Sequence, residues 1–333
     1  MAAQAPLITV IVPACRAAAT LPRAIASLRA QTVPDLAIRI VDDGSPDDTG
    51  AVADALARQD PRIAVRHQRN QGGYFARLNA ARVATTPWLA FVDADDTAEP
   101  TLYAELLAFA QDNDLDVAEC ERVGVPERPP EVLPDRDAVF RRYIRPNLLE
   151  GRGASFVWDK LYRNTPALAD FAALPIHQFD DLCLNLQFLR GVRRLGLLHR
   201  PLYRYDVNPG SSVRRLTPRH VRDLRNAIAF RRTVAPAYGL APDDPLFDAW
   251  ALKNARNFLV VAATGTLPAD WSRADAARAI TTAPEVQDAL RRAPRGTPCR
   301  RLLALAARHP ALVILFLSLA ARLRRLLSRR HSK

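Results

Sequence analysis

The chain has 333 residues, which is long enough for about two domains and a sizeable core. Hydrophobic residues make up 49% of it and charged residues 25%, a composition that excludes disordered, collagen-like and disulfide-scaffold proteins. The formal net charge of +12 indicates nucleic acid, an anionic membrane or an acidic ligand as partner. Residues 289–333 carry 12 Arg and Lys and no Asp or Glu, so residues 1–288 hold 35 residues of each sign. The whole basic excess therefore lies in the C-terminal segment.

Between residues 7 and 120, short apolar runs alternate with helical patterns. The apolar runs, which we expect to form strands, are residues 7–13, 36–41, 62–65, 88–92 and 115–120. The expected helices begin after Thr20, with Leu21, Ile25 and Leu28 on one face, and continue at residues 48–58, 73–83 and 100–110. Strict alternation with short links predicts an α/β fold whose mostly parallel sheet has helices on both faces.

The pattern changes after about residue 125. Residues 125–134 are rich in proline and indicate a loop or a boundary. Residues 150–215 mix short apolar pieces with aromatic and charged residues, so we expect irregular structure over the sheet. The remainder is helical in pattern, with expected helices at residues 217–234, 244–264, 270–280, 284–292 and 300–330.

Polar residues cluster directly after three of the expected strands. These clusters are residues 42–45, residues 70–73, which open a helix carrying Arg77 and Asn79, and residues 93–96. Any one of them alone is explained as a turn followed by a helix cap. Three clusters at the carboxyl edge of one sheet favour a ligand site, because open α/β sheets bind ligands at that edge.

The chemistry of these clusters narrows the ligand. Asp93 and Asp95 directly follow a buried strand, and closely spaced carboxylates favour a hard divalent cation, which Mg²⁺ in proteins often shares with phosphate oxygens. Neither a Walker phosphate loop nor a GxGxxG after the first strand is present, which disfavours a P-loop NTPase and a dinucleotide dehydrogenase. The four cysteines are far apart, which disfavours a zinc site or a disulfide framework and favours reduced cysteines in a cytosolic protein.

Four segments in order carry a family resemblance. They read ITVIVPACRAAATLPRAIASLRAQT, IRIVDDGSPDDT, NQGGYFARLNAAR and WLAFVDADD. Over about residues 7–110, the chain resembles family 2 glycosyltransferases. The resemblance implies a GT-A fold (a Rossmann-like, mostly parallel sheet), here followed by a C-terminal helical region. It also implies a nucleotide-diphosphate-sugar donor, with a UDP-sugar expected, and a bacterial cell-surface polysaccharide as product.

The resemblance also implies roles for individual donor-binding residues. Val12 and Pro13 would line the pocket for the nucleotide base, and Asp43 would accept a hydrogen bond from that base. Arg77 would help to place the donor, and Asp93 would approach its ribose or sugar.

The resemblance places the metal-binding residue in the same acidic segment. Asp95, the last Asp of the DxD motif, would be the metal ligand for Mn²⁺ or Mg²⁺. Asp96 extends the acidic cluster without a defined role.

The second half resembles the acceptor region of the same family. Residues 156–163, which include Trp158 and Lys160, are similar to a W-x-K-L-Y-R block. Asp180 and Asp181 resemble the "ED" motif, in which the second residue is the catalytic base, although Glu is commoner at the first position. Asp181 is therefore the implied general base, and the alternative is an ordinary helix N-cap.

Five positions could contact the donor diphosphate or the acceptor, namely Asp180, Trp158, Lys160, Arg204 and Ser211. Arg204 and Ser211 lie in a segment similar to the one that closes over the diphosphate in this family, and Arg214 follows it. Solvated loop residues are an equally good interpretation of each. His177 and His199 have no partner cluster at metal-binding spacing, so we expect surface or capping histidines.

The function implied is metal-assisted, inverting transfer of a sugar to an acceptor hydroxyl, with Asp181 as base. A catalytically idle nucleotide-sugar-binding or scaffold protein is the alternative. A nucleotidyltransferase is disfavoured because its Gly/Arg/Lys-rich N-terminal phosphate loop is absent.

The segment at residues 300–333 is basic and has an apolar helical face. That face carries Leu312, Phe316, Leu319, Leu323, Leu326 and Leu327. The pattern favours a helix lying on an anionic membrane surface, and hence a cytoplasmic enzyme held at the inner face of the plasma membrane near a glycan or lipid-linked acceptor. A helix packed on protein, or paired with another subunit, is the alternative. Nucleic acid is disfavoured because no reader motif accompanies the arginines.

We therefore divide the chain into three parts. Residues 1–215 form the GT-A domain, with a nucleotide-sugar half at about residues 1–125 and an acceptor half at about residues 126–215. Residues 216–299 form a helical extension, and residues 300–333 form the membrane-associating tail.

Overall fold

The computed structural model describes residues 5–33, 36–153, 155–206, 215–297 and 299–330, the last seven of these without their side chains. Its contacts divide the chain into two compact units. The first consists of Met1–Leu148 with Gly153–Asn208, and the second of Leu149–Arg152 with Pro209–Lys333. The finer division after residues 215 and 299 stays a prediction.

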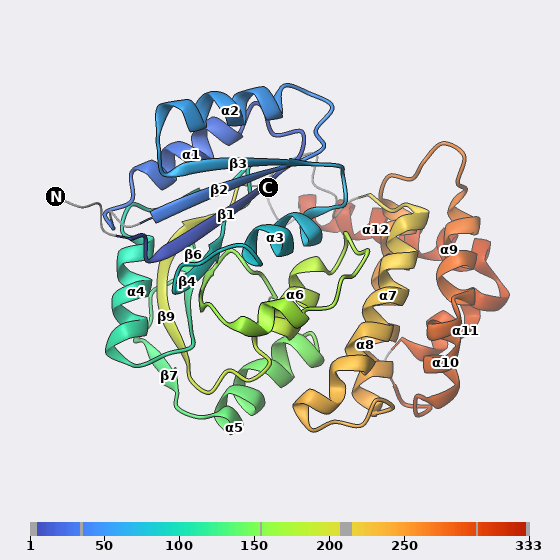
Figure 1. Cartoon of the computed structure of the whole chain (residues 1–333). Helices are drawn as coiled ribbons and strands as arrows, with labels where there is room; N and C mark the ends of the chain where they lie inside the picture. The colour runs from blue at the N-terminus through green and yellow to red at the C-terminus, as the bar shows by residue number, and fades with distance from the viewer. Residues whose placement is uncertain (1–4, 34–35, 154, 207–214, 298, 331–333) are drawn as a thin grey trace. The chain divides into compact units, whose positions relative to one another are not determined.

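The first unit is built on one nine-stranded sheet with the order β3-β2-β1-β4-β8-β6-β9-β5, and β7 pairs with β9 (Figure 1). The strands are β1 (Ile8–Ala14), β2 (Leu36–Asp43), β3 (Ile63–Gln68), β4 (Trp88–Phe91), β5 (Thr97–Ala98), β6 (Val117–Arg122), β7 (Glu131–Leu133), β8 (Lys160–Arg163) and β9 (Leu195–Arg204). The α-helices are α1 (Leu21–Arg29), α2 (Thr49–Gln59), α3 (Gly73–Ala81), α4 (Leu102–Asp112), α5 (Arg136–Val139) and α6 (Asp180–Phe188).

Most of the strands run in one direction. β1 pairs in parallel with β2 and β4, and β2 with β3. β8 is antiparallel to both β4 and β6, so those two share a direction, and β9 is parallel to β6. Only β5, β7 and β8 run the other way. The prediction of a mostly parallel α/β sheet is confirmed.

Helices cover both faces of this sheet. One core packs α1, α2 and α4 against alternate residues of β1, namely Ile8, Val10 and Val12. On the opposite face, Phe91 of β4 lies edge-on to Phe188 of α6, with ring centroids 5.6 Å apart. Figure 1 shows α1 and α2 on one side of the strands and α3 and α6 on the other. The central strands are therefore buried on both faces, as their uninterrupted apolar runs predict.

The expectation of irregular structure at residues 150–215 is wrong, because this stretch contributes β8, β9 and α6. β8 has only four residues, too few to show a period. β9 contains a glycine and a proline, and its pairing with β6 shifts register twice. Its burial consequently does not alternate, and the pattern on which strand prediction depends is lost. The proline-rich stretch before it also holds the short strand β7.

The second unit is helical. Its helices are α7 (Pro218–Val234), α8 (Pro245–Thr264), α9 (Arg273–Thr282), α10 (Pro284–Arg292), α11 (Arg300–Arg308) and α12 (Pro310–Arg330). The single helix expected at residues 300–330 is two helices, because Pro310 disfavours helical geometry at His309, whose φ is −134° and ψ 66°. Within the described ranges, no helix has the length and apolar content needed to cross a membrane.

The first residue of β8 carries a buried charged side chain. Lys160 is 1% exposed, and its Nζ lies 2.5 Å from Asp159 Oδ1 and 3.0 Å from Glu119 Oε2. The same Nζ donates a hydrogen bond to the Phe156 carbonyl at 2.7 Å. Each carboxylate would be costly to bury without this ammonium, so Lys160 holds β6 and β8 together electrostatically.

We expect Lys160→Met to lower the free energy of unfolding by about 3 kcal/mol, because it leaves the buried carboxylate of Asp159 and the partly buried one of Glu119 without this counter-charge. Urea denaturation measures this. The control is Arg141→Met, which removes an ion pair to Asp137 whose two side chains are 70% and 64% exposed. We expect that change to leave the free energy of unfolding nearly unchanged, because water screens an exposed ion pair. Equal losses in the two variants would contradict the assigned role of Lys160.

Candidate functional site

A cavity of about 350 Å³ opens at the carboxyl ends of β1, β2 and β4. We call it the carboxylate cavity. Its lining residues are Pro13, Ala14, Cys15, Arg16, Ala17, Thr20, Asp43, Gly73, Arg77, Asp93, Ala94, Asp95 and Asp180. It thus unites all three polar clusters that follow strands in the sequence, at the edge where open α/β sheets bind ligands. Its volume suits a small-molecule ligand.

The wall beside β2 is held by Asp43. Its Oδ1 accepts hydrogen bonds from Gln68 Nε2 at 2.8 Å and the Gln71 amide at 2.9 Å, and its Oδ2 accepts from the Gly72 amide at 2.7 Å. Gly72 has a φ of +93°, and a Cβ there would lie 2.4 Å from the His177 ring. A glycine is therefore required, and Asp43 shapes the loop between β3 and α3 as well as lining the cavity.

Arg77 of α3 is the electrostatic centre of the site. Its side chain is 8% exposed, and its guanidinium lies 2.6 Å from Asp93 Oδ1, 2.8 Å from Asp180 Oδ2 and 3.8 Å from Asp181 Oδ1. Burial opposes its charge, yet the carboxylates of Asp93, Asp181 and Asp180 raise the pKa of Arg77 above its usual value. Arg77 therefore stays charged and joins the end of β4 to the start of α6.

Gly73 makes room for this arrangement. A Cβ at Gly73 would lie 2.8 Å from Arg77 Nη1 and 3.1 Å from Asp180 Oδ2. A larger residue would press on the ion pair itself. The glycine at the first position of α3 is thus part of the site's geometry.

Asp180 and Asp181 open helix α6. Its N-cap is Phe179, so the expectation that Asp181 could be an ordinary N-cap is wrong. Asp181 is 22% exposed at its side chain, and its Oδ1 has no hydrogen-bond partner among the atoms that the structure describes. Burial raises the pKa of Asp181 well above its usual value, with Arg77 opposing and Asp180 and Asp93 reinforcing the shift. A carboxylate with a raised pKa is suited to accepting a proton.

The cavity reaches Asp180 rather than Asp181. Asp180 is among the lining residues, whereas Asp181 lies behind it, within reach of the same guanidinium. Burial raises the pKa of Asp180 too, against the opposing charge of Arg77. The two carboxylates therefore share one guanidinium, and of the two only Asp180 faces the cavity.

The DxD segment divides into cavity residues and a structural anchor. Asp93 and Asp95 line the cavity. Asp96 is buried and accepts hydrogen bonds from Tyr203 Oη at 2.8 Å and the Asp206 amide at 2.9 Å. Burial raises the pKa of Asp96 to about 7. The sequence assigned Asp96 no definite role, and its bonds show that it ties the segment to the end of β9.

The carboxylate oxygens at the cavity suit a single divalent ion that is also coordinated by a bound ligand. Within the described ranges, no three His, Cys, Asp or Glu side chains converge to hold a metal on their own. Asp95 offers carboxylate oxygens at the cavity wall, beside Asp93, whose carboxylate pairs with Arg77. Mg²⁺ commonly takes one or two protein carboxylates and completes its shell with phosphate and water. The residues therefore fit the expected cation.

Several expected contact residues lie outside the cavity lining. Val12 is 0% exposed in the core. Trp158 is buried and stacks on Tyr203, with ring centroids 4.2 Å apart. Lys160 is held by the ion pairs described above, and Arg204 pairs with Glu99 at 2.6 Å on the surface. Ser211 and Arg214 lie outside the described residues.

The sequence interpretation missed part of the cavity wall. Cys15, Arg16 and Thr20 line it, just after β1. Their position after the first buried strand was the available signal. In the sequence, these positions were used only to show that no glycine-rich motif follows the first strand.

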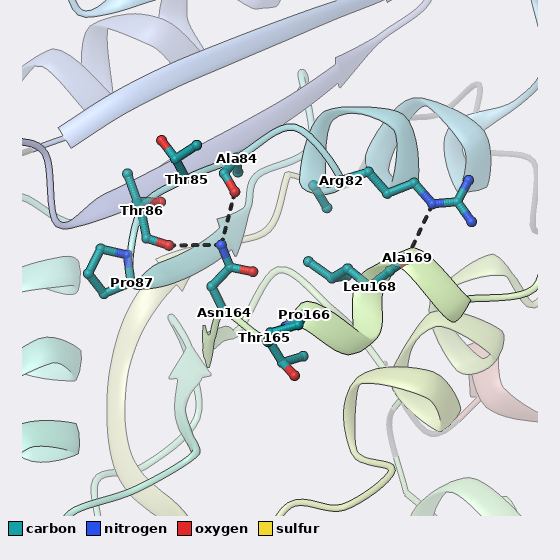
Figure 2. Close-up of a pocket in the computed structure, with 11 residues that line it drawn as sticks. Arg82, Ala84, Thr85, Thr86, Pro87, Asn164, Thr165, Pro166, Leu168 and Ala169 are labelled. Carbon is teal, nitrogen blue, oxygen red and sulfur yellow. Dashed lines mark hydrogen bonds between the residues drawn. The ribbon is translucent and has the colours of Figure 1, made fainter.

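A second hollow of about 710 Å³ lies at the opposite, amino end of β4 (Figure 2). Its polar groups already have partners. The Asn164 amide donates to the carbonyls of Ala84 and Thr86, and the Arg82 guanidinium donates to those of Leu168 and Phe171. These side chains are therefore already engaged in hydrogen bonds within the protein. The carboxylate cavity is the better candidate for a ligand-binding site.

We expect Arg77→Met to lower the free energy of unfolding by about 3 kcal/mol, because it leaves partly buried carboxylates uncompensated. Arg77→Lys keeps the charge but lacks the planar fork that spans Asp93 and Asp180, so we expect a smaller loss. Guanidinium denaturation of both variants checks this order. A methionine variant as stable as the wild type would refute the central role of the guanidinium.

Part of this chain matches a family of known proteins. Residues 9–163 match the model of glycosyl transferase family 2. The uncharacterized glycosyltransferase EpsJ of Bacillus subtilis (strain 168) is 31% identical over 217 residues, which cover 62% of each chain. The chain thus spans less than two thirds of the length of that relative.

Solved structures share the fold. TarS residues 1–349 of S. aureus, in complex with UDP-GlcNAc, match with a TM-score of 0.61 and 17% identity over 95% of this chain and 91% of that one. The mannosyltransferase PcManGT from Pyrobaculum calidifontis, in complex with GDP-Man and Mn²⁺, matches with a TM-score of 0.50 and 19% identity over 97% and 88%. Residues 9–163 thus resemble glycosyl transferase family 2, and the chain shares the GT-A fold of these structures.

Proposed function

We propose that the protein is an inverting glycosyltransferase that moves a sugar from a nucleotide diphosphate sugar, expected to be a UDP-sugar, to an acceptor hydroxyl of a cell-surface glycan. The observation that carries the proposal is the group of three carboxylates around Arg77, those of Asp93, Asp180 and Asp181, at the carboxyl edge of the sheet. The UDP-GlcNAc bound to TarS and the GDP-Man bound to PcManGT support this class of donor.

The donor would enter along the wall formed by Pro13 and Asp43. Asp43 already accepts one hydrogen bond from the end of β3 and two from the loop before α3, so it would position the base through that loop as well as by its own lone pairs. Asp95 would hold a divalent cation, which when bound neutralises charge on the leaving diphosphate. The Mn²⁺ bound to PcManGT supports that assignment.

Asp181 is the proposed general base. The acceptor oxygen would form a bond to the sugar C1 while the bond from C1 to the diphosphate breaks, and the hydroxyl proton would pass to the Asp181 carboxylate. This displacement inverts the anomeric centre and needs no covalent enzyme intermediate. The Oδ1 of Asp181, which has no hydrogen-bond partner among the described atoms, and the raised pKa of this carboxyl support the role, because a raised pKa makes a carboxylate a better proton acceptor.

We expect Asp181→Asn to lower the turnover number by about 10²–10⁴-fold, as the loss of a general base does, and to leave donor affinity nearly unchanged. In the wild type, turnover should rise with pH through the raised pKa of the base, and this limb should vanish in the variant. Transfer from a panel of UDP-sugars and calorimetry with UDP and Mn²⁺ give the two readouts.

The matched control is Asp137→Asn, at a side chain that is 64% exposed and distant from the cavity lining. It should leave transfer and donor binding unchanged. Unchanged turnover in Asp181→Asn would refute the base assignment. Donor binding without transfer or donor hydrolysis by the wild-type protein would refute the enzymatic proposal and indicate a nucleotide-sugar-binding protein.

We expect Asp95→Ala to abolish the dependence of donor binding on Mn²⁺, because it removes the carboxylate assigned to the cation. Titration of UDP with and without Mn²⁺ measures this, since the wild type should bind UDP more tightly with the ion. Asp137→Asn again serves as the control. A variant that keeps the full gain in affinity from Mn²⁺ would move the metal ligand elsewhere.

A further inference from the structure

Helix α12 has two contrasting faces. Val313 and Ile314 are 2% and 7% exposed, and Ser318 Oγ donates a hydrogen bond to the Ala263 carbonyl of α8 at 3.0 Å. One face is thus anchored to the second unit. The other exposes a row that we call the α12 stripe. The stripe residues are Leu312, Leu315, Phe316, Leu319 and Leu323, each 49–63% exposed.

Half of the large apolar side chains that the described surface exposes lie in the stripe. Of the ten such side chains, six lie between residues 305 and 323: the five stripe residues and Leu305 of α11. Their spacing of three and four residues along α12 places them on one side of the helix. Scattered exposed leucines need no explanation, but a contiguous apolar strip on a helix indicates a binding surface.

The charge of the C-terminal segment indicates which partner covers the α12 stripe. Residues 289–333 contain 12 basic and no acidic residues, and Arg301, Arg308 and Arg322 are exposed. A second copy of this chain docked stripe to stripe would bring two such basic segments together, and like charges at that density repel. An anionic bilayer satisfies both features, because its acyl chains take the apolar stripe and its phosphates pair with the arginines.

We propose that α12 lies in the plane of an anionic membrane surface, with the α12 stripe at the head-group and acyl-chain boundary. Val313, Ile314 and Ser318 keep the opposite face attached to the protein, so the helix binds lipid without leaving the fold. The inference does not depend on the proposed sugar transfer, since it rests on the exposed side chains and the charge of the second unit alone.

The test is co-sedimentation of the full chain with vesicles. We expect binding to phosphatidylcholine vesicles containing about 30% phosphatidylglycerol to be at least about tenfold tighter than binding to pure phosphatidylcholine, and to weaken severalfold in about 1 M salt. The combined variant Leu315→Ser, Phe316→Ser and Leu319→Ser should lose at least about tenfold in binding to the anionic vesicles.

The matched control is Val83→Ser with Val260→Ser, which removes exposed apolar groups outside the stripe. It should bind as the wild type does. Circular dichroism melting of both variants verifies that they fold. If a folded stripe variant binds like the wild type, the attraction is only electrostatic and the proposal fails. It also fails if light scattering shows stripe-dependent dimers and the wild type does not sediment with vesicles.

A second readout reports the depth of insertion. Phe316→Trp places an indole in the stripe, and anionic vesicles should shift its emission to the blue and quench it when their acyl chains are brominated. The Val260→Trp variant is the control and should show neither change. Equal responses at both positions would overturn the assignment of α12 as the membrane-contacting face.

Discussion

The site depends on one buried guanidinium. Arg77 reaches from α3 to carboxylates that arrive from two distant parts of the chain, Asp93 after β4 and Asp180 at the start of α6. Without that positive charge, the carboxyl ends of the central strands and the first turn of α6 would repel each other. The guanidinium therefore makes it possible to gather Asp93 and Asp180 at one cavity, with Asp181 directly behind Asp180.

The parts of the fold that could be predicted are those whose residues carry a local signal. The strands β1 to β4 are apolar runs bounded by turn residues, and Asp43 and Asp95, which the sequence places at the carboxyl ends of such strands, line the cavity. β9 was missed because its register shifts and its internal Gly196 and Pro201 remove the alternation of buried and exposed residues.

Contacts between residues far apart in the sequence account for the rest. Lys160 and Trp158 were candidate contacts of the diphosphate or the acceptor. The structure pairs Lys160 with Glu119, 41 positions earlier, inside the protein, and stacks Tyr203 on the ring of Trp158. A motif gives the residue types and their spacing, whereas burial depends on partners that tertiary structure supplies. In the second unit, too, tertiary contacts decide burial. One face of α12 packs on α8, while an apolar face of the same helix stays exposed.

The uneven distribution of charge has a consequence for regulation. The residues that line the carboxylate cavity belong to a stretch of 288 residues with equal numbers of acidic and basic groups, while the last 45 residues carry all of the excess. Ionic strength screens attraction between exposed charges and an anionic surface far more than it affects a buried ion pair. The lipid composition of a membrane, or its local salt, can therefore change how long the protein stays there without altering the electrostatics of its chemical site.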